Sequence, residues 1–146
     1  RLPTEAEWEY SCRAGAITAR PYGQTAELLD RYARFQANSQ RMASVVGRLK
    51  PNDLGLFDML GNAEEWCHDL FKPYSKGADR PVKDEFGDDR HIVSTRPRVL
   101  RGGSFADAAS QLQTAGRKGD LPSTAGPTYG IRVARTLPVS FRPPLP

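Results

Sequence analysis

The chain has 146 residues and a formal net charge of +4, with 21 lysine and arginine residues against 17 aspartate and glutamate residues. Apolar residues make up 38% of it, alongside 13 glycines and 12 prolines. This size fits one domain or part of one, and the glycine and proline content favours a loop-rich globular protein over a helical bundle. No apolar run approaches the roughly 18 residues of a membrane span, so we expect no membrane partner.

A helix is predicted to begin directly after Thr4. The Thr4 side chain can accept from the free amides of the first turn while Glu7 reaches back to the cap, which is a capping box. We expect the helix to run to about Arg13, with the glycine two residues further on placed to end it. Trp8 on this helix and Trp66 later in the chain are expected to be core anchors.

The middle of the chain is predicted to consist mostly of turns and loops. Residues 25–29 indicate one short helical turn. Glycine and asparagine residues within 45–62 indicate a folded loop with several special backbone angles. The polar, proline-rich stretch 72–97 has no clear period and is expected to be an excursion on the surface.

Two strands are predicted in the C-terminal half. The first covers 99–105 and opens into the glycine pair at 102–103, where a bulge or close backbone approach is expected. The second covers 129–135, where small or apolar residues alternate with basic ones, as is typical of a half-exposed strand.

Basic residues gather modestly at Arg96, Arg98 and Arg101 and again at Arg132 and Arg135. No aromatic residues are interleaved with them as a groove for single-stranded nucleic acid requires. We therefore favour a solvated or ion-paired strand face and expect no nucleic-acid partner.

The chain has two cysteines, Cys12 and Cys67. They are too few for a four-thiolate zinc site or a disulfide framework, so we expect two reduced, buried thiols. Neighbouring side chains diverge in strands and helices alike, which argues against Cys67 and His68 as a metal-binding or catalytic pair. His91 is expected to be a surface residue.

Several motifs occur in a particular order along the chain. They are RLPTEAEWEY at 1–10, CRAG at 12–15, KPN at 50–52, GLFDMLGNA at 55–63, EWC at 65–67, RGGSF at 101–105 and GIRV at 130–133. Their order and spacing resemble those of the formylglycine-generating-enzyme family, also called sulfatase-modifying factors. The resemblance implies an α+β, loop-rich, C-type-lectin-like fold with a small antiparallel sheet and few short helices. It further implies that 1–137 form the C-terminal part of such a domain, that its N-terminal half precedes Arg1, and that 138–146 are a proline-rich tail.

The resemblance also implies one calcium site. The Asp58 side chain, the Gly61 carbonyl, the Ala63 carbonyl and the Glu65 side chain match the family's ligand pattern. Calcium takes about six to eight oxygen ligands, and this spacing can supply four of them. A second calcium site of the family would need an asparagine where Arg34 stands, so we expect at most one. From the residues alone, Asp58 as a turn cap and Glu65 as a solvated side chain remain the alternative.

Copper is not expected, although the family's oxidase chemistry depends on it. Copper(I) is a soft ion that paired cysteines hold, and the matching places after the Gly-Gly-Ser motif are filled by about Asp107 and Leu112. Ser104 is retained from the family's active-site region. A serine without a partner base is a weak nucleophile, and at a strand end its hydroxyl more often bonds the backbone. We therefore expect no catalytic residue.

Three functional hypotheses follow. We favour a non-catalytic domain, a calcium-stabilised protein- or peptide-binding or regulatory module of a larger protein, whose ligand-facing loop includes Ser104, Phe105, Asp107 and Arg117. The second hypothesis is an enzyme, either a formylglycine generator with divergent ligands or an ergothioneine-type sulfoxide synthase. The third is a variable ligand-display protein, which requires hypervariability within 105–129.

Overall fold

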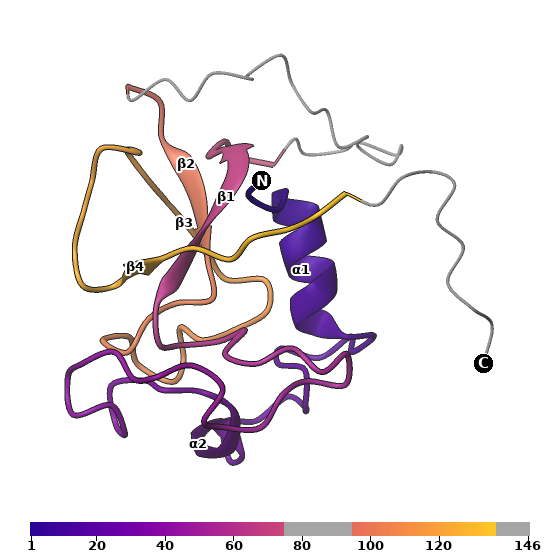
Figure 1. Ribbon diagram of the computed structural model, residues 1–146. Helices are drawn as coiled ribbons and strands as arrows, with labels where there is room; N and C mark the ends of the chain where they lie inside the picture. Colours follow the sequence, from indigo (N-terminus) through magenta and orange to yellow (C-terminus); the bar gives the residue numbers. More distant parts are fainter. Residues whose placement is uncertain (75–94, 137–146) are drawn as a thin grey trace.

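The computed structural model describes residues 1–74 and 95–136 (Figure 1). Its elements are two short helices and four short strands joined by long loops, which confirms the loop-rich α+β fold. They are α1 (Glu5–Arg13), α2 (Leu29–Tyr32), β1 (Glu64–Leu70), β2 (Arg98–Arg101), β3 (Arg117–Asp120) and β4 (Tyr129–Gly130). Most of the predicted surface excursion at 72–97, including His91, and the proline-rich tail at 138–146 lie outside the described residues. Within residues 1–74 and 95–136 no helix is long and apolar enough to cross a membrane.

The strands form one sheet in the order β3-β2-β1-β4. β2 runs antiparallel to both β1 and β3, as expected, whereas β4 pairs with β1 in parallel. The sheet is therefore mixed. The reason is topological, because β3 and β4 lie on opposite edges and the loop at 121–128 carries the chain across the sheet before β4 begins.

Helix α1 begins and ends where local chemistry places it. The Thr4 hydroxyl accepts from the Glu7 amide at 3.1 Å, and the Glu7 carboxylate accepts from the Thr4 amide at 2.8 Å, so the predicted capping box is confirmed. Ala14 takes a left-handed conformation with φ 50° at the C-cap, and Gly15 follows with φ 88°. These two residues turn the chain away from the helix axis.

The hydrophobic core lies between α1, β1, β2 and the loops that follow them. Its buried members are Trp8, Cys12, Leu29, Ala33, Met59, Leu60, Cys67, Val99 and Leu112. The Gly102 backbone passes so close to Trp8 that an added Cβ would lie 3.1 Å from the indole ring. The glycine pair thus permits the close backbone approach that the sequence indicates.

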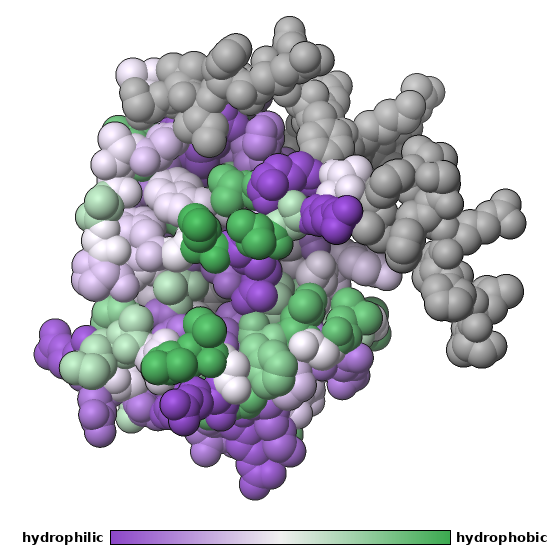
Figure 2. All heavy atoms as spheres, viewed as in Figure 1, coloured by the Kyte–Doolittle hydropathy of each residue, from purple (hydrophilic) through white to green (hydrophobic). Residues whose placement is uncertain are grey.

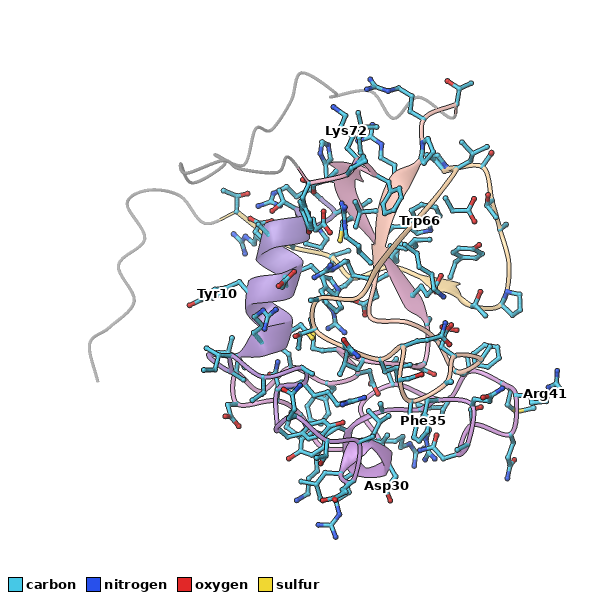
Figure 3. The ribbon with its side chains drawn as sticks, turned by 180° about the vertical axis from the view of Figure 1, so that it is seen from behind. Tyr10, Asp30, Phe35, Arg41, Trp66 and Lys72 are labelled. Carbon is cyan, nitrogen blue, oxygen red and sulfur yellow. The ribbon has the colours of Figure 1, made fainter. Side chains whose placement is uncertain are left out.

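Several features differ from the sequence predictions. The short helix α2 begins at Leu29, the last residue of the predicted 25–29 turn, and so lies almost entirely after it. The strand predicted at 129–135 is reduced to the two residues of β4, and beyond it Ile131 and Val133 are exposed while Arg132 turns inward. Arg132 faces inward because it pairs with a buried glutamate, an interaction that the alternating pattern cannot reveal. Trp66 is half-buried rather than a core anchor and stacks on Tyr129 with ring centroids 5.7 Å apart (Figure 3).

Candidate functional site

The loop at 45–62 is shaped by a series of left-handed residues, as predicted. Positive φ angles occur at Gly47, Gly55, Asp58, Gly61 and Asn62. The Asn62 side chain joins the end of the loop to Ser44, directly before its start. Its Oδ1 accepts from the Ser44 amide at 2.8 Å, and its Nδ2 donates to the Ser44 carbonyl at 3.2 Å. The Asp58 Oδ2 accepts from the Gly47 amide at 2.7 Å.

This loop and the segment after β4 line an open cleft with a volume of about 580 Å³. Figure 2 shows apolar side chains gathered on the face that carries β4, in one group near that strand and another below it. The cleft is lined by Val46, Gly47, Gly55, Leu56, Phe57, Asp58, Asn62, Ala63, Glu65, Gly130, Ile131, Arg132 and Val133. Its rim is mainly apolar. Its charged side chains are Asp58 from the loop, Glu65 from β1 and Arg132 from the segment after β4.

Three of the four predicted calcium ligands lie on this cleft. Asp58, Ala63 and Glu65 line it, whereas Gly61 is buried behind the wall. The set offers hard oxygen donors from carboxylates and loop carbonyls, which suits calcium. Within the described part of the chain, however, no three His, Cys, Asp or Glu side chains gather into a metal site.

Glu65 is already engaged by other donors. Arg132 donates to both of its carboxylate oxygens, Nη2 to Oε1 and Nε to Oε2, each at 2.8 Å. The indole Nε1 of the buried Trp8 donates to Oε2 at 2.7 Å. A calcium ion would therefore have to share Glu65 with a guanidinium of like charge or displace it, so the fit of the residues to calcium is partial.

The region that matches the family's copper loop is filled by a different set of groups. Asp107 Oδ2 accepts from both the amide and the hydroxyl of Ser104 at 2.7 Å, and Oδ1 accepts from Lys118 Nζ at 2.9 Å. Lys118 also pairs with Glu64 of β1. We call Glu64, Ser104, Asp107 and Lys118 the closed network.

Electrostatics within the closed network favour the charged forms. Burial would raise the pKa of Asp107, but hydrogen bonds from Lys118 and Ser104 outweigh it and hold the pKa below its usual value. Burial would likewise lower the pKa of Lys118, and the hydrogen bonds with Glu64 and Asp107 raise it instead. The Ser104 hydroxyl accepts from the backbone amide of Ala106 at 3.2 Å, as expected, and also donates to Asp107. Its acceptor is already stabilised as an anion, which does not activate the hydroxyl as a nucleophile.

Neither cysteine is placed or ionised for metal binding. Both are free and buried, as predicted. Burial raises the pKa of Cys12 to about 12 and raises that of Cys67 well above its usual value. Leu112, at the second matching position of the copper loop, is fully buried in the core. Positions 107 and 112 thus hold an anchored carboxylate and a core leucine.

The side chains predicted to face a ligand are turned inward, and their role in ligand binding stays a prediction. Ser104, Phe105 and Asp107 are 2%, 6% and 9% exposed. Arg117 donates to both carboxylate oxygens of Glu5 at 2.7 Å and lies over the rings of Phe71 and Tyr74. These residues turn inward because their polar groups find partners there. The exposed residues between 104 and 117 are instead Ala106, Ser110, Gln111, Gln113 and Ala115.

The basic strand face is ion-paired, as the sequence interpretation favours. Arg101 is 1% exposed, pairs with Glu5 and Glu9 of α1, and lies over the Trp8 ring at 5.2 Å from its centroid. Sequence reasoning missed the roles of Glu64, Lys118 and Arg132. Their signal was a charged residue placed within a strand or directly after one, where burial requires a partner.

The chain matches a family described as "Sulfatase-modifying factor enzyme 1-like domain" over residues 1–137. Serine/threonine-protein kinase pkn1 of Chlamydia pneumoniae is 35% identical to it over 94% of this chain and 21% of the kinase. Formylglycine-generating enzyme of Streptomyces coelicolor is 32% identical over 92% of this chain and 46% of the enzyme. The solved structure of Treponema denticola variable protein 1 has a TM-score of 0.78 and 34% identity, covering 90% of this chain and 45% of that protein. The chain therefore spans less than half the length of each of these relatives.

Proposed function

The chain belongs to the family of sulfatase-modifying factor enzyme 1-like domains, and from that premise we propose that it is a non-catalytic, calcium-stabilised binding or regulatory module of a larger protein. The observation that carries the proposal is the closed network at position 107. A carboxylate with three hydrogen bonds, two from Ser104 and one from Lys118, stands where copper(I) needs a thiolate. The buried Leu112 replaces the second thiolate.

Similarity to the Chlamydia pneumoniae kinase supports the modular part of the proposal. The matched region is 21% of that protein, so a domain of this type is there one part of a longer chain. The formylglycine-generating enzyme and variable protein 1 are matched over 46% and 45% of their lengths. These shares support the proposal that the N-terminal half of the domain is a partner of this chain.

The cleft is the surface that we propose for a protein or peptide ligand. Phe57, Ile131 and Val133 are large apolar residues exposed on its rim, and apolar area of this kind favours association. β4 is an edge strand, so an extended peptide could add to the sheet beside it while its side chains enter the cleft.

Calcium, in this proposal, stiffens the cleft wall. The Asp58 and Glu65 carboxylates with the Gly61 and Ala63 carbonyls would hold the ion, which supplies a cross-link between the loop and β1. Arg132 would have to loosen its hold on Glu65, because a guanidinium and a calcium ion repel each other at the same carboxylate. Calcium binding and the position of Arg132 are thereby coupled.

Metal content tests the proposal directly. Element-resolved mass spectrometry of the protein after exposure to calcium and copper(I) should find about one calcium and no stoichiometric copper. Stoichiometric copper would overturn the non-catalytic assignment and call for an oxidase assay. In a thermal melt, Asp58→Ala should abolish a chelator-sensitive shift that the exposed neighbour variant Asp53→Ala retains; equal shifts in both variants contradict the ligand assignment.

A second candidate function is variable ligand display. The likeness to Treponema denticola variable protein 1 favours it, and so do the exposed side chains of Ala106, Ser110, Gln111 and Gln113, which could vary without disturbing the core. Sequencing this segment in several copies from related strains distinguishes the candidates. Variation confined to those exposed positions supports display, and uniform sequences exclude it.

A further inference from the structure

The Arg34 guanidinium reaches into the fold without a carboxylate partner among the described residues, and it is less well bonded than those of Arg20 and Arg98, which donate to backbone carbonyls. Arg101 and Arg132 are each matched by carboxylates. The Arg34 side chain makes a single long hydrogen bond among the described residues, from Nη1 to the Asn38 carbonyl at 3.4 Å, and its Nε is buried with no partner there. A half-buried guanidinium that lacks a counter-charge has unused capacity to bind an anion.

The Arg34 side chain lines a pocket of about 230 Å³, separate from the cleft. Its other lining residues are Asn38, Ser39, Gln40, Met42, Ala43 and Ser44. Most are polar and none is acidic. A water molecule takes about 30 Å³ in the liquid, so the pocket has room for a small polyatomic anion.

The pocket walls are held in place without using Arg34. Asn38 Oδ1 accepts from the Phe35 amide at 2.9 Å, and Asn38 Nδ2 donates to the Ala33 carbonyl at 3.0 Å. The Ser39 hydroxyl donates to the Phe105 carbonyl at 2.9 Å. Such preorganised walls lower the ordering cost of binding a ligand.

The backbone of Arg34 is fixed as firmly as the walls. Its carbonyl accepts from the Asn62 amide at 2.7 Å, and Gly61 packs so closely that an added Cβ would lie 2.2 Å from the same carbonyl oxygen. The opposite wall is anchored at Ser44 through both polar atoms of the Asn62 side chain. Asn62 therefore holds both sides of the pocket at a set distance.

The surrounding segment strengthens the positive potential. Residues 31–52 contain no aspartate or glutamate, and their cationic residues are Arg31, Arg34, Arg41, Arg48 and Lys50. Figure 3 shows Arg41 projecting away from the body of the molecule. A run of one sign raises the local concentration of counter-ions, while the pocket decides which of them is held.

We propose that this pocket binds a phosphate group. The Arg34 guanidinium is the charged donor, because its planar fork matches the spacing of phosphate oxygens. The Gln40 amide and the Ser44 hydroxyl, both on the pocket wall, supply neutral donors. The site is distinct from the cleft and the closed network, so it stands or falls independently of the proposed function.

Titration with inorganic phosphate and with phosphoserine at constant ionic strength tests the proposal. Backbone amide NMR shifts should change saturably at 38–44, and Arg34→Gln should weaken binding by about tenfold or more, the loss expected for a hydrogen bond to a charged group. Arg41→Gln is the matched control, since it removes the same charge from the same loop outside the pocket lining, and it should retain most of the affinity. Acetate at the same ionic strength should bind more weakly than phosphate.

Each outcome is decisive. Saturation by phosphoserine at lower concentration than by phosphate identifies a phosphorylated side chain as the source of the group, and the reverse order identifies the free ion. Absence of saturable shifts at 38–44 in the unaltered protein overturns the proposal, whatever the variants do. Equal losses in Arg34→Gln and Arg41→Gln also overturn it, because they indicate only a diffuse positive field. Melting in chloride buffer checks that Arg34→Gln is folded, and Arg34→Lys provides a second variant that keeps the charge but not the fork.

Discussion

Adjacent glutamates of β1 point to opposite faces of the sheet and meet different surroundings. Glu64 joins Lys118 and Asp107 in the closed network, where each carboxylate is matched by a donor from the chain itself. Glu65 lies on the other face with Arg132, beside an open cleft with an apolar rim. The comparison teaches that neighbouring side chains of one strand can lie in very different surroundings, one within a set of matched charges and the other beside an open cleft.

The largest expected effect on stability comes from truncating Leu112, the core leucine in the same segment as Asp107 of the closed network. Leu112→Ala should lower the free energy of unfolding by about 2–5 kcal/mol, because it removes buried methyl groups and leaves a cavity. Val133→Ala on the cleft rim is the control and should change it by about 0.5 kcal/mol or less, since that side chain is exposed. Urea denaturation measures both. Similar losses in the two variants would mean that the rim is covered in solution.

A matched pair of glutamate variants sharpens the comparison between the faces of β1. Glu65→Ala should cost about 1–3 kcal/mol, because the buried Trp8 indole loses its acceptor. Glu64→Ala should cost about 0–1 kcal/mol, because Lys118 is half-exposed and keeps Asp107 as a partner. Equilibrium unfolding in urea at neutral pH gives both values. A larger loss of unfolding free energy in Glu64→Ala than in Glu65→Ala would contradict this comparison of the two faces.

Acid should weaken the closed network at Asp107. The pKa of Asp107 is lowered in the folded protein, so its stabilisation is fully present above the unfolded pKa of about 3.9 and is lost as pH falls through the folded value. The gap in unfolding free energy between the unaltered protein and Asp107→Asn should therefore shrink below about pH 4. Denaturant melts from pH 6 downwards measure it, and a constant gap refutes the role of the Asp107 charge.

The smallest expected effect on stability is on the cleft rim. Ile131→Ser should leave the free energy of unfolding unchanged within about 0.5 kcal/mol, because the side chain is 69% exposed. It should nevertheless reduce the binding of a fluorescent apolar probe to the cleft, which titration at fixed protein concentration measures. Unchanged probe binding would place the apolar contact surface elsewhere.

Local interactions explain which elements were predictable. The α1 capping box joins residues three positions apart, and the positive φ angles of 47–62 follow from residues suited to left-handed conformations. β1 and β3 were not predicted, because Glu64–Leu70 and Arg117–Asp120 carry charges that are unusual inside a sheet. These charged side chains are tolerated within the sheet only because other elements supply their partners. The calcium ligands remain a prediction.

By itself the sequence determined the family, the helix cap, the left-handed loop positions and the lack of thiols at 107 and 112, since these depend on residue type or on near neighbours. Only the tertiary structure decided which charged side chains pair with one another. Arg132 meets Glu65 from 67 positions away and Arg101 meets Glu5 from 96 positions away. No local pattern encodes such pairings, because they arise only when packing brings distant elements together and burial demands that their charges be matched.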